Sequence, residues 1–279
     1  MLCGALIKTT LADYPGKVAC AWFLTGCSLR CPYCYNGDLV FNRLPPENSY
    51  TEQQVFEHLQ KRCNVLSGFV ISGGEALLHD EIGSIIEKAK KIGYAVKLDT
   101  NGMHPDKLEK LFEKTETTPD FIALDIKTSA QRYSLLGSGT EVNNAQKSLK
   151  RCIELCRRLS STCVEYRTVL VPPLVKKDDI KNIASLLPQN ALWRFAAFRA
   201  ENCINPAYND IVPYNAGYCP LCAKLYTGFN FTLIFLLFYR SVIFCHFFVG
   251  YQYVVEQPVT QKTYKCVGHK LFTARICVY

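Results

Sequence analysis

Three cysteines lie within eight residues of the sequence, at a spacing that suits a set of ligands. Cys27, Cys31 and Cys34 follow the pattern C-x3-C-x2-C, just after an apolar run over residues 18–24 that ends at Thr25-Gly26. An iron–sulfur cubane binds through thiolates on its irons, and three thiolates leave the fourth iron without a protein ligand. An electron-rich cluster with one open iron can chelate a small molecule and reduce it. We therefore predict a [4Fe-4S] cluster on a loop after the first strand.

Other interpretations of these thiols are less well supported. A disulfide framework needs an even number of cysteines and an oxidising compartment, and nothing marks the chain as secreted. A structural zinc site takes four ligands and usually pairs one C-x2-C with a second. Here His58 and Cys63 are the residues that could complete such a site. Buried cysteines without a ligand are the third interpretation.

An alternation of strand and helix patterns predicts how this loop is positioned. Strands are predicted at residues 18–24, 68–72, 94–98, 121–127, 163–170 and 192–198. Helices are predicted from Thr51 (with Gln54 as capping-box partner), from Asp80 to a stop at Gly93, and over 105–114, 143–159 and 177–187. Such alternation indicates parallel strands joined by helical crossovers. Six units are fewer than a closed eight-stranded barrel contains, so we predict an α/β fold, an open, partial, six-stranded β/α barrel of the TIM type.

Glycines and polar residues follow the second and third predicted strands. Gly73-Gly74-Glu75 ends the second strand, and Asp99-Thr100-Asn101-Gly102 ends the third. Paired glycines let a backbone approach a ligand closely, although ordinary turns also use glycine and Asn-Gly. Chemistry in barrels of this type lies at the carboxyl ends of the strands. We therefore place both segments in one site with the cysteine loop.

Charged residues occur in two later strands, although charged side chains are not expected in an apolar core. Asp125 and Lys127 are two residues apart in a strand, so their side chains point to the same face. An acid and a base inside a barrel must pair with each other or serve a ligand. Arg167 lies in the fifth strand, where a surface position is the alternative. Asp13 lies in the turn before the first strand and can be explained either as a turn residue or as a site residue.

The cysteine loop resembles the signature of the radical S-adenosylmethionine (SAM) superfamily. That signature also has an aromatic residue before the third cysteine, and Tyr33 occupies this position. The resemblance implies that the open iron binds the amino and carboxylate groups of SAM. It further implies reductive cleavage of the sulfonium to methionine and a 5′-deoxyadenosyl radical. The motif is specific for the superfamily and says little about the substrate.

The same resemblance implies roles for the residues at the strand ends. Gly73-Gly74-Glu75 is similar to a glycine-glycine-glutamate motif that contacts the SAM amino group. The Asp99-Thr100-Asn101 segment resembles a strand end whose aspartate and threonine, together with Asp125, help to hold a monovalent cation beside the SAM carboxylate. Lys127 is expected to meet that carboxylate. Arg167 is expected to reach the carboxylate or the ribose.

The stretch from Asp13 to Asn36 most resembles the glycyl-radical-enzyme activases. The activating proteins of anaerobic ribonucleotide reductase are the most similar subgroup, followed by the pyruvate formate-lyase activases, and the resemblance extends from Leu6 to Tyr208. It implies that the radical takes a hydrogen atom from a glycine of a partner glycyl-radical enzyme, with Asp13 and Asn36 beside that substrate. It also implies a flavodoxin or ferredoxin as electron donor.

Two alternative functions stay open at this point. One is a radical SAM enzyme acting on a small molecule such as a deazapurine. The other is a non-catalytic remnant that binds an iron–sulfur cluster or zinc. Formation of 5′-deoxyadenosine separates either enzyme from the remnant, and a glycyl radical on a partner protein separates the two enzymes.

Composition limits other classes of function. The net charge is +8 over 279 residues, and residues 228–279 hold five bases and one acid, a net +4. The sequence has neither an arginine-rich helix nor an alternation of basic and aromatic residues, the patterns that would indicate nucleic-acid binding. The amino terminus lacks a signal sequence, and many of the 15 cysteines stand alone in apolar surroundings. These features predict that the protein resides in a reducing cytoplasm. Because oxygen destroys an exposed reduced cluster, we also expect anaerobic or microaerobic conditions.

The character of the chain changes near residue 213. We predict a core domain over residues 1–212 and an atypical extension over residues 213–279. Cys219 and Cys222 form a C-x2-C pair that could bind metal with Cys203, although unliganded cysteines are favoured.

Residues 229–249 are rich in Phe and Leu and have the length of a membrane span. Arg240 lies at the middle of this stretch and costs about 3 kcal/mol there, so membrane contact is not favoured. A shifted reading frame over a truncated domain is the favoured interpretation of the tail. A membrane anchor and an aggregation-prone extension are the alternatives.

Overall fold

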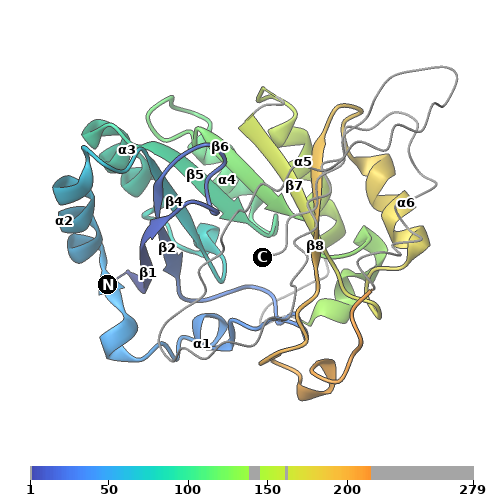
Figure 1. Cartoon of the computed structure of the whole chain (residues 1–279). Coiled ribbons are helices and arrows are strands. Elements are labelled where there is room, and N and C mark those ends of the chain that lie inside the picture. Colours follow the sequence, from blue (N-terminus) through green and yellow to red (C-terminus); the bar gives the residue numbers. More distant parts are fainter. Residues whose placement is uncertain (1, 138–144, 161–162, 215–279) are drawn as a thin grey trace, which may run out of the picture.

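An eight-stranded sheet forms the centre of the structure, a computed structural model that describes residues 2–137, 145–160 and 163–214 (Figure 1). The strand order is β3-β1-β2-β4-β5-β6-β7-β8. The strands are Cys3–Thr10 (β1), Ala19–Leu24 (β2), Tyr50–Thr51 (β3), Gly68–Gly73 (β4), Ala95–Thr100 (β5), Phe121–Asp125 (β6), Val164–Leu170 (β7) and Leu192–Ala197 (β8). In the part of the chain that is described, β3 and β8 are the two edges, so the sheet is open.

Six of these strands are parallel, and helices connect them. Parallel pairing runs from β2 through β4, β5, β6 and β7 to β8. The helices are Gly37–Val40 (α1), Glu52–Arg62 (α2), Ile82–Ile92 (α3), Pro105–Leu111 (α4), Ala145–Cys156 (α5) and Lys177–Leu186 (α6). Figure 1 shows α2, α3 and α6 outside the curved sheet. The predicted open α/β barrel with six parallel strands is confirmed.

Two antiparallel strands extend the sheet beyond that prediction. β1 pairs antiparallel with β2, for example Gly4 with Leu24, and β3 pairs antiparallel with β1. The sequence predicted no strand before residue 18 and only a turn at Asp13 in this segment. The pairing explains Gly4, since a Cβ at that position would collide with the Phe23 backbone.

The helix boundaries follow from local chemistry that the sequence already displays. The Thr51 hydroxyl accepts a hydrogen bond from the Gln54 backbone, and the Gln54 side chain accepts one from the Thr51 backbone, which confirms the capping box of α2. Gly93 ends α3 in the left-handed conformation, with φ of 103°. Both devices satisfy backbone groups that a helix end leaves without partners.

The two faces of the sheet differ in polarity. On β2, Cys20 and Trp22 belong to the large core cluster that includes residues of the outer helices. Ala19 and Ala21 point the opposite way and belong to a small apolar cluster inside the curve. Further along the sheet the inner face carries charged residues instead, namely Lys97, Asp99, Glu165, Arg167 and Arg194. The interior is therefore apolar at one side and charged at the other.

The atypical carboxyl-terminal region lies almost entirely outside the described residues. Cys219, Cys222 and the apolar stretch 229–249 are among the residues that are not described, so the predictions made for them stay predictions. Within the described ranges, no helix has both the length and the apolar character that a membrane span requires.

A matched pair of leucine substitutions tests the packing of the helices on the sheet. Leu59 of α2 is fully buried, whereas Leu11 is 73% exposed. Leu59→Ala is expected to lower the free energy of unfolding by about 2–5 kcal/mol, because it removes buried methyl groups and leaves a cavity. Leu11→Ala should change it by less than about 0.5 kcal/mol. Urea unfolding measures both, and equal losses would contradict the assigned core.

Candidate functional site

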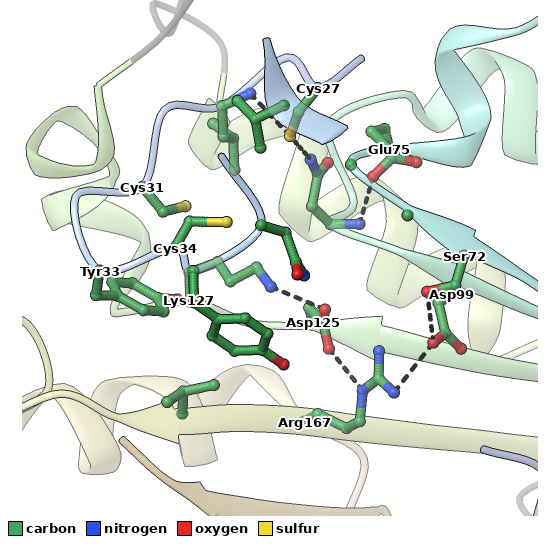
Figure 2. A pocket seen from close by; sticks show the side chains of 18 of the residues that line it. Cys27, Cys31, Tyr33, Cys34, Ser72, Glu75, Asp99, Asp125, Lys127 and Arg167 are labelled. Atoms are coloured by element: carbon green, nitrogen blue, oxygen red, sulfur yellow. Dashed lines mark hydrogen bonds and ion pairs between the residues drawn. The ribbon is translucent and has the colours of Figure 1, made fainter. Parts of the chain in front are cut away.

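One pocket gathers the residues that the sequence singles out. It has a volume of about 230 Å³ and lies at the carboxyl ends of the parallel strands (Figure 2). All of the predicted site residues line it: Asp13, Cys27, Cys31, Tyr33, Cys34, Asn36, Gly73, Gly74, Glu75, Asp99, Thr100, Asn101, Asp125, Lys127 and Arg167. Their juxtaposition is a fact of the structure, while the ligand roles assigned to them stay predictions.

The cysteine loop brings its three thiols to this pocket. Figure 2 shows Cys27, Cys31 and Cys34 around a common space, and none of them is in a disulfide. Among the described residues, no three His, Cys, Asp or Glu side chains are arranged to hold a single metal ion. A cubane binds its thiolates through separate irons and therefore spaces them more widely than one ion does.

Burial makes these thiols poor acids unless positive charge is present. It raises the pKa of the Cys27 thiol to about 11 and that of Cys31 to about 12, and it raises the pKa of Cys34 as well. Bound metal supplies the charge that keeps buried thiolates ionised. Three unpaired thiols around one pocket are thus a donor set that fits a [4Fe-4S] cluster.

Segments distant in sequence hold the cysteine loop in place. The Gly26 amide donates to the Leu39 carbonyl of α1 at 2.7 Å. On the other side, the Ile204 amide donates to the Cys34 carbonyl at 2.8 Å, and the Asn205 amide donates to the Pro32 carbonyl at 2.9 Å. The segment that follows β8 therefore helps to hold the cysteine loop in position.

Cys203 lies in this supporting segment and does not line the pocket. Its side chain is buried, and its thiol lies near the carbonyl oxygens of Arg199 and Glu201. The metal site suggested for Cys203 with Cys219 and Cys222 involves residues that are not described.

The glycine pair packs backbone against backbone. Gly73 has a φ of 126°, and a Cβ there would collide with the Leu24 backbone; a Cβ on Gly74 would collide with the Gly26 carbonyl. The Gly74 amide donates to the Leu24 carbonyl at 2.9 Å, and the Glu75 amide donates to the Gly26 carbonyl at 2.8 Å. Close approach of two chains explains why glycine is required here. The predicted contact with the SAM amino group is a separate matter that stays a prediction.

Glu75 links the ends of β4 and β5. Its carboxylate accepts hydrogen bonds from the Thr100 hydroxyl at 2.8 Å, the Asn101 amide at 2.7 Å and the Leu77 amide at 3.0 Å. Burial raises the pKa of Glu75 to about 7, even though these hydrogen bonds act to lower it. This side chain orders the two strand ends that border the cysteine loop.

A chain of ion pairs forms the charged floor of the pocket (Figure 2). Lys127 donates to Asp125 at 2.8 Å, and Arg167 bridges Asp125 at 2.6 Å and Asp99 at 3.2 Å. Lys97 also contacts Asp99, at 2.6 Å. We call these five residues the charged floor. Parallel register explains the bridge, because Asp125 of β6 lies opposite Arg167 of β7.

Electrostatics keeps this floor ionised. Burial by itself would raise the pKa of Asp125 and of Asp99, but Arg167 and the neighbouring lysines together outweigh it and lower both. Lys127 reinforces the effect at Asp125, and Lys97 at Asp99. Burial acts to lower the pKa of Lys127, yet Asp125, together with Tyr33 and Cys31, raises it well above its ordinary value.

The predicted cation site uses groups that already have protein partners. Both Asp99 and Asp125 are paired with Arg167, and the Thr100 hydroxyl donates to Glu75. A monovalent cation would require these contacts to rearrange, so its binding stays a prediction.

An unpaired buried hydroxyl suits a small molecule in the pocket. Within the described part of the chain, the hydroxyl of Tyr33 is buried without a hydrogen-bond partner. Its ring meets Phe198 edge to face, with centroids 6.3 Å apart. A buried polar group without a partner is costly, so a ligand atom at this point is expected. The pocket thus fits SAM as well as a cluster.

Sequence reasoning missed Ser72, which lines the pocket, and the buried Lys97, which pairs with a pocket residue. Ser72 donates to Asp99 at 3.0 Å, and Lys97 is paired with the same carboxylate. Lys97 and Asp99 show the same two-residue spacing of base and acid that identified Asp125 and Lys127, so this signal was present in the sequence. Phe198 and Arg199 also line the pocket, but only the fold brings them beside the cysteine loop.

Substitution of Gly74 tests the packing under the cysteine loop. Gly74→Ala is expected to displace this loop and to cost about 1–3 kcal/mol of stability, because the Cβ meets the fixed Gly26 carbonyl. Gly83→Ala in α3 is the matched control, since its Cβ would make ordinary contacts and alanine favours helix. Thermal unfolding and iron content after reconstitution are measured. A Gly74 variant as stable as the Gly83 variant would contradict the packing.

Replacement of Arg167 tests the charged floor. The pKa of Asp125 in the fold is below its unfolded value of about 3.9, so its ion pairs stabilise the fold above that pH. Arg167→Met is expected to cost about 3 kcal/mol at pH 7 by leaving buried carboxylates underpaired. The cost should shrink as the pH falls towards about 4, because the variant can then protonate them. Urea unfolding across this pH range measures it, and a cost independent of pH would refute the assignment.

Comparisons with known proteins bear on this geometry. Residues 23–187, more than half of the chain, match the family described as the Radical SAM superfamily. A protein of Methanocaldococcus jannaschii named as a candidate glycyl-radical enzyme activating enzyme is 29% identical over 215 residues, covering 75% of this chain and 85% of its own. A pyruvate formate-lyase-activating enzyme of Streptococcus mutans is 29% identical over 175 residues, covering 60% of this chain and 64% of its own.

Solved structures are similar to a lower degree. QueE from Escherichia coli has a TM-score of 0.44 at 15% identity, covering 70% of this chain and 83% of its own. The match of residues 23–187 includes the three cysteines and the charged floor. Family membership implies a [4Fe-4S] cluster and SAM, for which the pocket has a fitting donor set and an unpaired hydroxyl. The chain belongs to the radical SAM superfamily and is an enzyme of that superfamily.

Proposed function

We propose that this enzyme activates a glycyl-radical enzyme, with anaerobic ribonucleotide reductase as the favoured partner. The observation that carries the proposal is the convergence of three buried or half-buried thiols and the polar strand ends on one pocket. The names of two relatives support the choice of an activase, since each covers more than half of this chain.

The cysteine loop is proposed to hold the cluster, and the pocket beside it to hold SAM. Cys27, Cys31 and Cys34 would ligate three irons of a [4Fe-4S] cluster. When bound and reduced, the cluster with SAM supplies reductive cleavage of the sulfonium and a 5′-deoxyadenosyl radical that takes a hydrogen atom from the substrate. The reaction needs no general base from the protein, so the task of the chain is to bind, to orient and to exclude water.

The charged floor favours an anionic group above it. Two of its bases, Lys127 and Arg167, line the pocket, whereas Lys97 is buried and does not. Arg and Lys are the side chains that form strong charge-assisted hydrogen bonds to a carboxylate. We assign the SAM carboxylate to this floor, with Lys127 nearest to the cysteine loop.

Asp13 and Asn36 are proposed to contact the substrate. Both line the same pocket as the cysteines, and the Asp13 carboxylate is oriented by the Thr10 hydroxyl at 2.6 Å. A carboxylate and a carboxamide can hydrogen-bond to the backbone of a peptide, which suits a glycine in a protein loop.

We further propose residues 1–212 as the core domain, a flavodoxin or ferredoxin as electron donor, and a reducing cytoplasm without oxygen as the setting.

Anaerobic reconstitution tests this function. The wild-type protein is expected to bind about four irons per chain and, with dithionite, to convert SAM to methionine and 5′-deoxyadenosine. Cys31→Ala should lose the iron and the activity. Cys63→Ala, at an exposed position outside the pocket, should keep both.

The partner is tested in the same mixture by electron paramagnetic resonance. A glycyl radical on co-incubated anaerobic ribonucleotide reductase supports the activase. Formation of 5′-deoxyadenosine without a glycyl radical on any glycyl-radical enzyme would favour a small-molecule substrate. Failure to produce 5′-deoxyadenosine at all would reject the enzymatic proposal.

A further inference from the structure

The side chain of Asn101 lies against the sulfur of Cys27. Its Nδ2 atom is 3.7 Å from Cys27 Sγ and 3.5 Å from the Ser28 hydroxyl. The Met103 amide donates to Asn101 Oδ1 at 3.0 Å, so the NH2 group must be the end that faces the sulfur. The side chain is only 4% exposed, and water therefore does not compete for this contact.

The backbone of Asn101 is held as firmly as its side chain. Its amide donates to Glu75 Oε2 at 2.7 Å, and the Thr100 hydroxyl donates to the other oxygen of the same carboxylate. Glu75 in turn donates through its own amide to the Gly26 carbonyl, next to Cys27 in sequence. The turn after β5 and the cysteine loop are thus joined at two points, and the NH2 group is aimed rather than free to rotate.

The sulfur of Cys27 therefore has two N–H donors from two different segments. The Leu29 amide, from the loop itself, lies 3.4 Å from Sγ, and Asn101 provides the second donor. N–H donors stabilise negative charge on a thiolate, and reduction of an iron–sulfur cluster adds negative charge to it. Hydrogen bonds to the sulfurs are among the factors that set the reduction potential of such clusters.

We propose that Asn101 is a positioning residue that raises the reduction potential of the cluster by donating an N–H to the Cys27 thiolate. The proposal rests on the proposed function, because it requires the three cysteines to hold a cluster. Asn101, at the end of β5, acts on the cluster through Cys27. By raising the reduction potential, its N–H makes electron transfer from an outside reductant more favourable.

Redox titration of the reconstituted protein tests this role. Asn101→Leu removes the donor with little change in volume. It is expected to shift the midpoint potential to a more negative value, equivalent to a two- to tenfold, or about 0.4–1.4 kcal/mol, loss in the equilibrium constant for reduction. Asn101→Asp keeps the shape and the acceptor for Met103 but points oxygen at the sulfur, so it should shift the potential further. The signal of the reduced cluster in electron paramagnetic resonance reports the titration.

Ser28→Ala is the matched control, because it removes the other neighbour of the Asn101 NH2 group and leaves the donor to sulfur in place. Its midpoint potential should equal that of the wild type. Wild-type potentials in both Asn101 variants at full iron content would overturn the proposal. If Asn101→Leu binds no iron, Asn101→Ala, which also lacks the N–H donor and adds no charge, decides in its place. A wild-type protein that never holds a cluster would instead refute the proposed function.

Discussion

Backbone packing between the end of β4 and the cysteine loop is the contact on which the site depends. Gly73 and Gly74 let two chains approach at a distance that no Cβ permits, and amides of the β4 end donate to carbonyls of Leu24 and Gly26. Because Cys27 follows directly, its sulfur is placed by this contact. Glu75 then accepts hydrogen bonds from Thr100 and Asn101 at the end of β5. The carboxyl ends of β2, β4 and β5 are thereby fixed relative to one another.

A second constraint acts on the charged floor. Charges this deep are costly unless each has a partner, and the ion pairs of Asp99, Asp125 and Arg167 meet that requirement in the part of the chain described. The same pairs hold the side chains of the floor in fixed positions. We propose that the same side chains bind the SAM carboxylate, so a substitution here should affect both stability and binding.

Much of the fold and of the pocket followed from local patterns. The strand–helix alternation predicted six parallel strands, and the polar strand ends predicted residues that share one pocket, because parallel strands end at the same edge. β1 was missed because its pairing with β2 is specified by a partner strand and not by its own periodicity. Lys97 was missed although its spacing from Asp99 repeats that of Asp125 and Lys127.

The sequence by itself determined the spacing C-x3-C-x2-C, from which the ligand set is predicted, because this pattern needs only neighbouring residues. Tertiary structure alone decided which groups surround that set. The segment at Ile204 and Asn205 supports the loop from more than 160 residues away, and Asn101 reaches Cys27 across 74 positions. Contacts at such separations arise from the register of parallel strands and the curvature of the sheet, and no local residue pattern encodes either of these.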